Sequence, residues 1–218
     1  MRPENVEVMS SFSSRGNSRP KVIVFDLGKV FLEFDYMKGA VGIARSAKLP
    51  PEDIIRVISG HPALIAYETG RISTDEFFRV MCDVTGFQGS PEEFFEHFTN
   101  VFIPVEEMID FNEQLRAKGY RTYILSNTNQ VTVEHIRRSY PFFSHFDGYV
   151  FSYECGVMKP DPAIYQAMER LAGVSGEEIF YVDDLPSNVE GARKLGWQAY
   201  VHESPARTIQ IAKMLGII

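Results

Sequence analysis

The chain has few cysteines and no long apolar segment, and these absences exclude several classes of protein. Its 218 residues include only Cys82 and Cys155, too few and too far apart for a disulfide framework or a zinc site. No uninterrupted apolar run approaches the about 18 residues needed to cross a membrane. Residues 1–20, rich in Ser, Arg, Asn and Pro, lack the apolar stretch of a secretory signal. We therefore expect a cytoplasmic protein with no membrane partner and a disordered tail at residues 1–20.

Positive charge is also scarce. The chain carries 22 basic and 29 acidic residues, a formal net charge of -7. Sequence-independent nucleic-acid binding needs a basic face, so the balance argues against a nucleic-acid partner. A small anion can still bind, because its site depends on local charge only. The 44% of hydrophobic residues is enough for a sizeable core. The expected partner is a small molecule, and monomer and homodimer both stay open.

Short apolar runs alternate with helical patterns along most of the chain. Strands are expected at residues 21–25, 121–125, 148–151, 178–182 and 198–201. Helical spacing, with fitting start and stop residues, is expected at 105–118, 163–171 and 186–195. Such alternation predicts a parallel sheet with right-handed crossovers. We expect an α/β fold, a Rossmann-like doubly wound core made of residues 21–34 and 104–218.

The segment of residues 35–103 has a different character. No convincing strand pattern occurs in it, and helix starts of the capping-box type occur at Ser73 and Ser90. Phenylalanines recur beside these starts. We therefore expect an all-helical cap domain, inserted after the first strand of the sheet.

Polar side chains gather where the expected strands end, which is where open parallel sheets bind ligands. They are Asp26 after the first strand, Ser126 and Asn127 after the second, Asp183 and Asp184 after the fourth, and Lys159 in the loop before a helix. Each one alone is an ordinary cap, turn or surface residue. Together they suit phosphoryl transfer: a carboxylate can attack phosphorus, and a magnesium ion and an ammonium group can screen the negative charge.

The order of these motifs resembles that of the haloacid dehalogenase superfamily. The matching strings are Phe25-Asp26-Leu27-Gly28, Leu125-Ser126-Asn127-Thr128, Lys159-Pro160 and Asp183-Asp184. Within the superfamily, Gly156-Val157-Met158-Lys159-Pro160 and Asn188-Val189-Glu190-Gly191-Ala192 are similar to strings of the bacterial α-glucose-1-phosphate phosphatase-like proteins. The resemblance implies a Mg²⁺-dependent phosphatase that hydrolyses a small phosphorylated metabolite, such as a sugar phosphate, through an aspartyl-phosphate.

The resemblance also implies a role for each matching residue. Asp26 would be the nucleophile and a metal ligand, and the backbone carbonyl of Gly28 a second metal ligand. Ser126 and Asn127 would bind the transferring phosphoryl group. Lys159 would neutralise Asp26 and the phosphoryl oxygens. Asp184 would be the direct acidic metal ligand, with Asp183 supporting it.

Two positions depart from the family pattern. Gly28 stands where these phosphatases have a second aspartate that protonates the leaving group, and Asn188 occupies a later acidic position of the fourth motif. General acid–base help is worth about 10²–10⁴ in rate. The loss predicts either a substrate with a good leaving group or a substitute acid. The candidate substitutes are Glu33, Asp35 and Glu68.

Two other functions stay open at this point. A 2-haloacid dehalogenase would also use Asp26, and because halide leaves without a proton, Gly28 would not matter to it. A catalytically weakened phosphate-binding or regulatory protein is the other alternative, again because Gly28 replaces the general acid. The substrate would be selected by cap side chains, for which Phe34, Tyr36, Tyr67 and Arg71 are the candidates.

Overall fold

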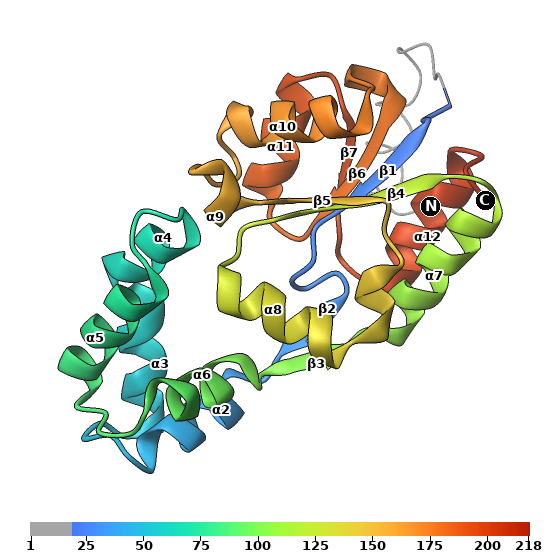
Figure 1. The fold of residues 1–218 in the computed structure, drawn as a ribbon. Coiled ribbons are helices and arrows are strands. Elements are labelled where there is room, and N and C mark those ends of the chain that lie inside the picture. The colour runs from blue at the N-terminus through green and yellow to red at the C-terminus, as the bar shows by residue number, and fades with distance from the viewer. Residues whose placement is uncertain (1–18) are drawn as a thin grey trace, which may run out of the picture.

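The computed structural model of the protein describes residues 19–218, so most of the expected tail at 1–20 lies outside the described residues. Its centre is a five-stranded parallel sheet in the order β5-β4-β1-β6-β7 (Figure 1). The strands are β1 (Val22–Phe25), β4 (Arg121–Ser126), β5 (Gly148–Phe151), β6 (Ile179–Asp183) and β7 (Gln198–Val201). All five coincide with the apolar runs of the sequence, and the expected fold class is confirmed.

Helices cover both faces of the sheet, which is why its central strands are apolar throughout. In β1, Ile23 and Phe25 face one core, and Val22 and Val24 face the other. The first face packs against α7 (Glu106–Ala117) and α12 (Pro205–Met214), and the second against α10 (Pro162–Ala172) and α11 (Pro186–Lys194). The doubly wound arrangement follows from this two-sided burial. The remaining core helices are α8 (Gln130–Ser139), α9 (Ser152–Cys155), η1 (Pro141–Ser144) and η2 (Gly176–Glu178).

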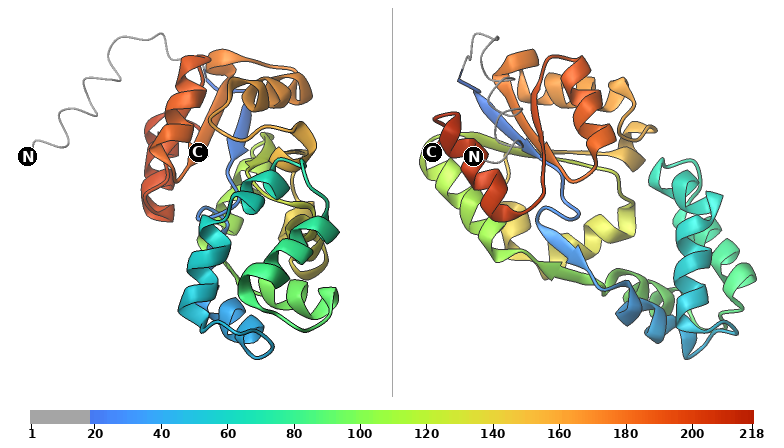
Figure 2. Two further views of the ribbon diagram at one scale, coloured as in Figure 1. Left: turned by 90° about the vertical axis from the view of Figure 1, so that its left-hand side faces the viewer. Right: turned by 180° about the vertical axis from the view of Figure 1, so that it is seen from behind.

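A helical insert, residues 35–101, lies beside the sheet and is joined to it by two short strands (Figure 2). Its helices are α2 (Tyr36–Ala44), α3 (Pro51–Gly60), α4 (Pro62–Glu68), α5 (Thr74–Thr85) and α6 (Pro91–Thr99). The joining strands, β2 (Leu32–Phe34) and β3 (Phe102–Pro104), pair antiparallel. No sequence pattern predicted this pair. Residues 102 and 103, expected in the helical insert, are in β3, whereas the insert begins at residue 35 as expected.

The insert has a hydrophobic core of its own. Phe77 and Phe94 are fully buried there, and the ring of Tyr67 stacks on Phe77 at a centroid distance of 4.6 Å. Ser73 begins α5 with the complete capping box that its spacing with Glu76 predicts. Among the described residues, no helix combines the length and the apolar character that crossing a membrane requires.

Candidate active site

The register of the sheet brings three polar residues to one edge. Phe25 is paired with Ile124 of β4 and with Val182 of β6, so the three strands end at nearly the same level. Asp26 follows β1 and its amide donates to the carbonyl of Val182 (2.9 Å). Ser126 and Asp183 are the last residues of their strands. A site at the carboxyl edge of the sheet therefore follows from strand pairing alone.

Lys159 links two carboxylates at this edge. Its Nζ lies 2.9 Å from Oδ1 of Asp26 and 2.6 Å from Oδ2 of Asp183, and it also donates to the carbonyl of Leu125 at 2.9 Å. The lysine is 5% exposed, although it comes from a loop. Burial lowers the pKa of Lys159, but the two carboxylates outweigh this and leave its pKa raised. The ammonium therefore stays charged between its two partners.

The Lys159 loop is held in place by the loop that follows β4. The side-chain amide of Asn127 donates to the Lys159 carbonyl (3.1 Å), and the Lys159 amide donates to Oδ1 of Asn127 (2.8 Å). Next to it, the Thr128 amide donates to Ser152 Oγ (2.9 Å), and this hydroxyl donates to the Thr128 carbonyl (3.0 Å). These reciprocal pairs fix the two loops to one another.

Asp183 is fully buried and is surrounded by donors. Besides Lys159, the Leu185 amide and the Tyr181 hydroxyl donate to its carboxylate. The side-chain amide of Asn188 lies 3.0 Å from Oδ1 and 3.1 Å from Oδ2. The sequence presented Asn188 as a lost acid, whereas the structure places it as a donor to the neighbouring aspartate. Only the approach of α11 to the end of β6 reveals this contact.

Three carboxylates form a group that could hold a cation. Asp26, Asp183 and Asp184 each offer one oxygen, and these oxygens lie within 4.8 Å of one another. Burial raises the pKa of Asp26 to about 7, although Lys159 lowers it, and the nearby Asp183 raises it further. Burial also raises the pKa of Asp184, with a second contribution from Asp183. Crowded acidic oxygens of this kind are the ligands that Mg²⁺ prefers, so the residues fit the ion.

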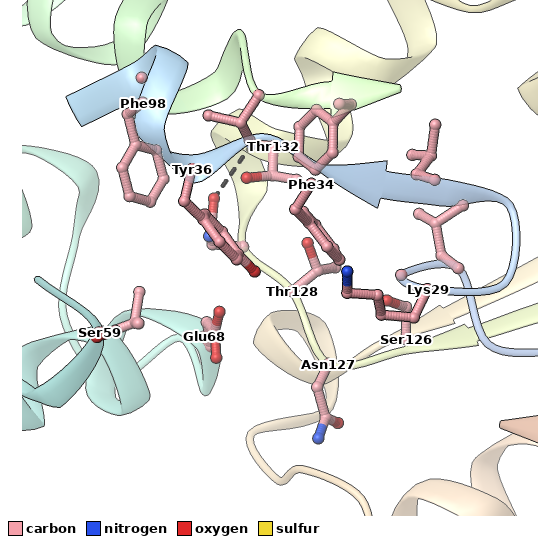
Figure 3. Close-up of a pocket in the computed structure, with 18 of the residues that line it drawn as sticks. Lys29, Phe34, Tyr36, Ser59, Glu68, Phe98, Ser126, Asn127, Thr128 and Thr132 are labelled. Carbon is pink, nitrogen blue, oxygen red and sulfur yellow. Dashed lines mark hydrogen bonds between the residues drawn. The ribbon is translucent and has the colours of Figure 1, made fainter. Parts of the chain in front are cut away.

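A cavity of about 610 Å³ opens in front of these groups, between the sheet edge and the insert (Figure 3). Glu68 and Ser59 line it from the insert and Ser126 and Asn127 from the end of β4, with the side chain of Asn127 turned away from the other labelled residues. The polar residues of the core that line it are Asp26, Lys29, Ser126, Asn127, Thr128, Asn129, Thr132, Lys159, Asp184 and Asn188. Asp183 lies behind Lys159 and is not part of the lining. Asp26 and Asp184 are thus the carboxylates of the group that face the cavity.

The structure separates the three candidate substitutes for the acid missing at Gly28. Glu33 is on the surface, paired with Lys29 at 2.5 Å. Asp35 caps α2, and its Oδ1 accepts from the Lys38 amide at 3.0 Å. Glu68 alone of the three lines the cavity, where burial raises its pKa to about 7.

The four candidate cap residues divide in the same way. Phe34 and Tyr36 line the cavity with stacked rings, whose centroids are 5.1 Å apart. Tyr67 belongs to the core of the insert and its hydroxyl is hydrogen-bonded to Thr74. Arg71 is exposed, and neither it nor Tyr67 lines the cavity.

Leu185, directly after the paired aspartates, also lines the cavity and is 50% exposed. This residue could not be singled out from the sequence, because an apolar residue after a strand carries no chemical signal.

Comparison with known proteins gives one family. The model of the haloacid dehalogenase-like hydrolases matches residues 20–196. D-ribitol-5-phosphate phosphatase of Bacteroides thetaiotaomicron is 28% identical, over 85% of this chain and 93% of that protein. Sesquiterpene phosphatase astK of Aspergillus oryzae is 24% identical, over 69% of this chain and 78% of that protein. Among crystal structures, a haloacid dehalogenase family enzyme of B. thetaiotaomicron in complex with magnesium and inorganic phosphate is similar, with a TM-score of 0.70, 25% identity, and coverage of 84% and 93% of the two chains.

Proposed function

The chain belongs to the haloacid dehalogenase-like hydrolases, and we propose that it is a Mg²⁺-dependent phosphatase of a small phosphorylated metabolite, acting through an aspartyl-phosphate. The observation that carries the proposal is the contact of Lys159 with Asp26 at the sheet end of the cavity, beside Asp184. It combines a nucleophile, a fixed cation and an oxygen group fit for a metal in one place. The similarity to a phosphatase of B. thetaiotaomicron supports the same reaction class.

Asp26 is the expected nucleophile. Its Oδ1 is held by the Leu27 amide (2.7 Å) and by Lys159, while Oδ2 receives no hydrogen bond from any residue of 19–218. Oδ2 is therefore free to attack phosphorus. A Mg²⁺ ion held by Asp26, Asp184 and the carbonyl of Gly28 would supply positive charge that favours the ionised carboxylate and screens the phosphoryl oxygens.

The groups around Asp26 would position the phosphoryl group. Ser126 lies one residue beyond the level of Asp26 on the neighbouring strand, and its hydroxyl faces the cavity with Asn127 beside it. Lys159 donates to both carboxylates and can neutralise a phosphoryl oxygen without moving far. Because Asn127 and Lys159 are hydrogen-bonded to one another, the donors are fixed before substrate binds. Donors arranged in advance are the main source of transition-state stabilisation in such sites.

Glu68 is the residue that we propose as proton donor to the leaving group. It faces the cavity from the insert, and its raised pKa keeps part of it protonated near neutral pH. In this arrangement the insert acts as a cap that completes the site from the side opposite Asp26. Glu68→Gln should lower turnover of an alkyl phosphate by about 10²-fold or more and that of p-nitrophenyl phosphate much less, since nitrophenolate leaves without a proton. Equal losses on both would remove Glu68 from this role.

The proposed function is tested by p-nitrophenyl phosphate hydrolysis with magnesium, with EDTA and with Asp26→Asn. We expect turnover that requires magnesium and is lost in the variant. We also expect that a phospho-enzyme intermediate can be trapped before phosphate is released. Turnover of a 2-haloacid that survives EDTA would favour a dehalogenase. Absence of turnover with tight phosphate binding would favour a phosphate-binding protein.

A further inference from the structure

We propose that the substrate of this site is the monophosphate of a largely apolar alcohol, whose carbon skeleton lies along the insert while its phosphate meets Asp26. This inference rests on the proposed phosphatase function and names its substrate class. The alcohol part of the substrate is expected to be aliphatic or isoprenoid-like, whereas a sugar phosphate would present a polyol.

The wall that the insert contributes to the cavity is apolar over four of its helices. It consists mainly of Ile43 of α2, Ile54, Ile55 and Ile58 of α3, Leu64 of α4 and Phe98 of α6. The core adds Leu32, Phe34 and Leu185. Phosphate-binding groups are confined to the sheet end, so the cavity has one polar end and one apolar end. This is the shape of a site for an amphipathic ligand.

The few polar groups on the insert side do not form a site for a polyol. Ser59 donates its hydroxyl to the carbonyl of Ile55 in its own helix at 2.7 Å. Glu68 is a single carboxylate, set at the boundary between the two ends of the cavity. A sugar or polyol carries several hydroxyl groups, and each one buried without a partner costs binding free energy. An alkyl chain has no such requirement and gains from leaving water.

Of the other polar side chains in the lining, two are also committed, and Lys29 is one of them, paired with Glu33 at 2.5 Å. The amide of Asn129 caps α8 with its Oδ1 accepting from the Thr132 amide (3.1 Å). The ring of Tyr36 stacks on Phe34 with an interplanar angle of 4°, which presents a flat aromatic surface beside the apolar wall. The cavity of about 610 Å³ is much larger than a phosphate group and within the usual range for pockets that enclose small molecules. The excess volume lies against apolar side chains.

The test is a series of n-alkyl monophosphates from ethyl to octyl, compared with ribitol 5-phosphate and glycerol 3-phosphate. Burial of each methylene should raise kcat/KM about fourfold until the cavity is filled. Octyl phosphate should therefore exceed ethyl phosphate by at least 100-fold and should also exceed both polyol phosphates. A flat series, or a preference for a polyol phosphate, would overturn the proposal even when p-nitrophenyl phosphate is hydrolysed normally.

A pair of variants locates the effect. Ile55→Ala, in the apolar wall, should lower the octyl-to-ethyl ratio of kcat/KM about tenfold or more. Ile65→Ala is the matched control, because Ile65 is 57% exposed on the neighbouring helix and does not line the cavity. It should leave the ratio unchanged. Equal effects of the two variants would count against the proposed wall.

Binding to the Asp26→Asn protein separates this inference from the catalytic proposal. Calorimetry with the series from ethyl to octyl phosphate should show an affinity that rises with chain length. Binding of octyl phosphate should also show a negative heat-capacity change, the marker of apolar burial. This result would support the apolar site even in the absence of turnover. Affinity independent of chain length would overturn it, whatever the protein does to p-nitrophenyl phosphate.

Discussion

The ring of Phe34 occupies the space that a side chain at Gly28 would need. A Cβ at position 28 would lie 2.8 Å from Cζ of Phe34, well inside van der Waals contact. The ring is restrained on its other sides by Tyr36 and Phe102, at centroid distances of 5.1 and 5.5 Å. The glycine at position 28 and the aromatic ring above it are thus linked, because the ring fills the space that an acidic side chain at position 28 would need. Phe34 closes the sheet end of the cavity where the family's proton donor would stand.

Gly28→Asp should therefore fail to restore a general acid. Forcing a side chain against Phe34 is overpacking, which costs about 1–3 kcal/mol of the free energy of unfolding. Phe34→Ala should relieve part of this cost, so the two substitutions should couple in a double-mutant cycle followed by urea unfolding. Gly119→Ala is not a suitable control because of its positive φ, whereas Gly60→Ala, with open space around it, is. Additive effects of the Gly28 and Phe34 substitutions would contradict the contact.

The fold and the site differ in how far the sequence predicted them. The parallel strands were predictable because burial on both faces leaves a continuous apolar run, as in Val22–Phe25. Strands β2 and β3 were not, because each has three residues and pairs with a segment about 70 positions away. A three-residue strand is too short to display an alternating pattern.

Within the site, the sequence named residue types and the structure supplied their relations. Strand ends placed Asp26 and Asp183 side by side, as their positions in the sheet predict. The sequence could not choose among Glu33, Asp35 and Glu68, since the choice depends on how the insert is placed against the sheet. The apolar wall was equally hidden, because isoleucines at helical spacing serve a core and a pocket alike.

Asn188 should contribute to stability through Asp183. Its amide donates to both oxygens of a carboxylate that is fully buried, and Asn188 itself is 2% exposed. Asn188→Ala should lower the free energy of unfolding by about 1.5–3 kcal/mol, the range for hydrogen bonds to charged groups. Asn188→Asp should cost more in the absence of magnesium, because it sets two carboxylates against one another. Urea unfolding measures both, with the exposed neighbour Ser187→Ala as control; an effect no larger than that of the control would contradict the role.

Lys159 should affect both stability and turnover. Lys159→Met leaves Asp26 and Asp183 buried without their cation, which should cost about 3–5 kcal/mol of the free energy of unfolding. Where the variant still folds, kcat should fall about 10²–10³-fold, as for other fixed donors to a transition state. Lys21→Met is the matched control, because Lys21 pairs with Glu178 on the surface, where such pairs contribute about 0–1 kcal/mol. Equal behaviour of the two variants would show that Lys159 is not the cation of the site.

Glu68 should give the protein a pH-dependent stability that Glu68→Gln removes. Burial raises its pKa from 4.5 to about 7, so the folded protein holds a proton that the unfolded chain releases above pH 4.5. Its contribution is fully present below about pH 4.5 and is lost as pH rises to about 7. Because the side chain is partly exposed, we expect a loss on the order of 1 kcal/mol.

Urea unfolding at pH 5 and pH 8 measures the Glu68 effect as a difference between wild type and Glu68→Gln. The variant should gain stability relative to wild type on going from pH 5 to pH 8, since the amide has no charge to bury. Taking the difference cancels the contributions of the other carboxylates, including those at the sheet edge. Glu33→Gln, an identical substitution at an exposed position, reports the effect of the amide itself. A Glu68→Gln difference that stays constant with pH would mean that Glu68 is solvated in solution, and the cavity would then have to be more open there than the packing around α4 indicates.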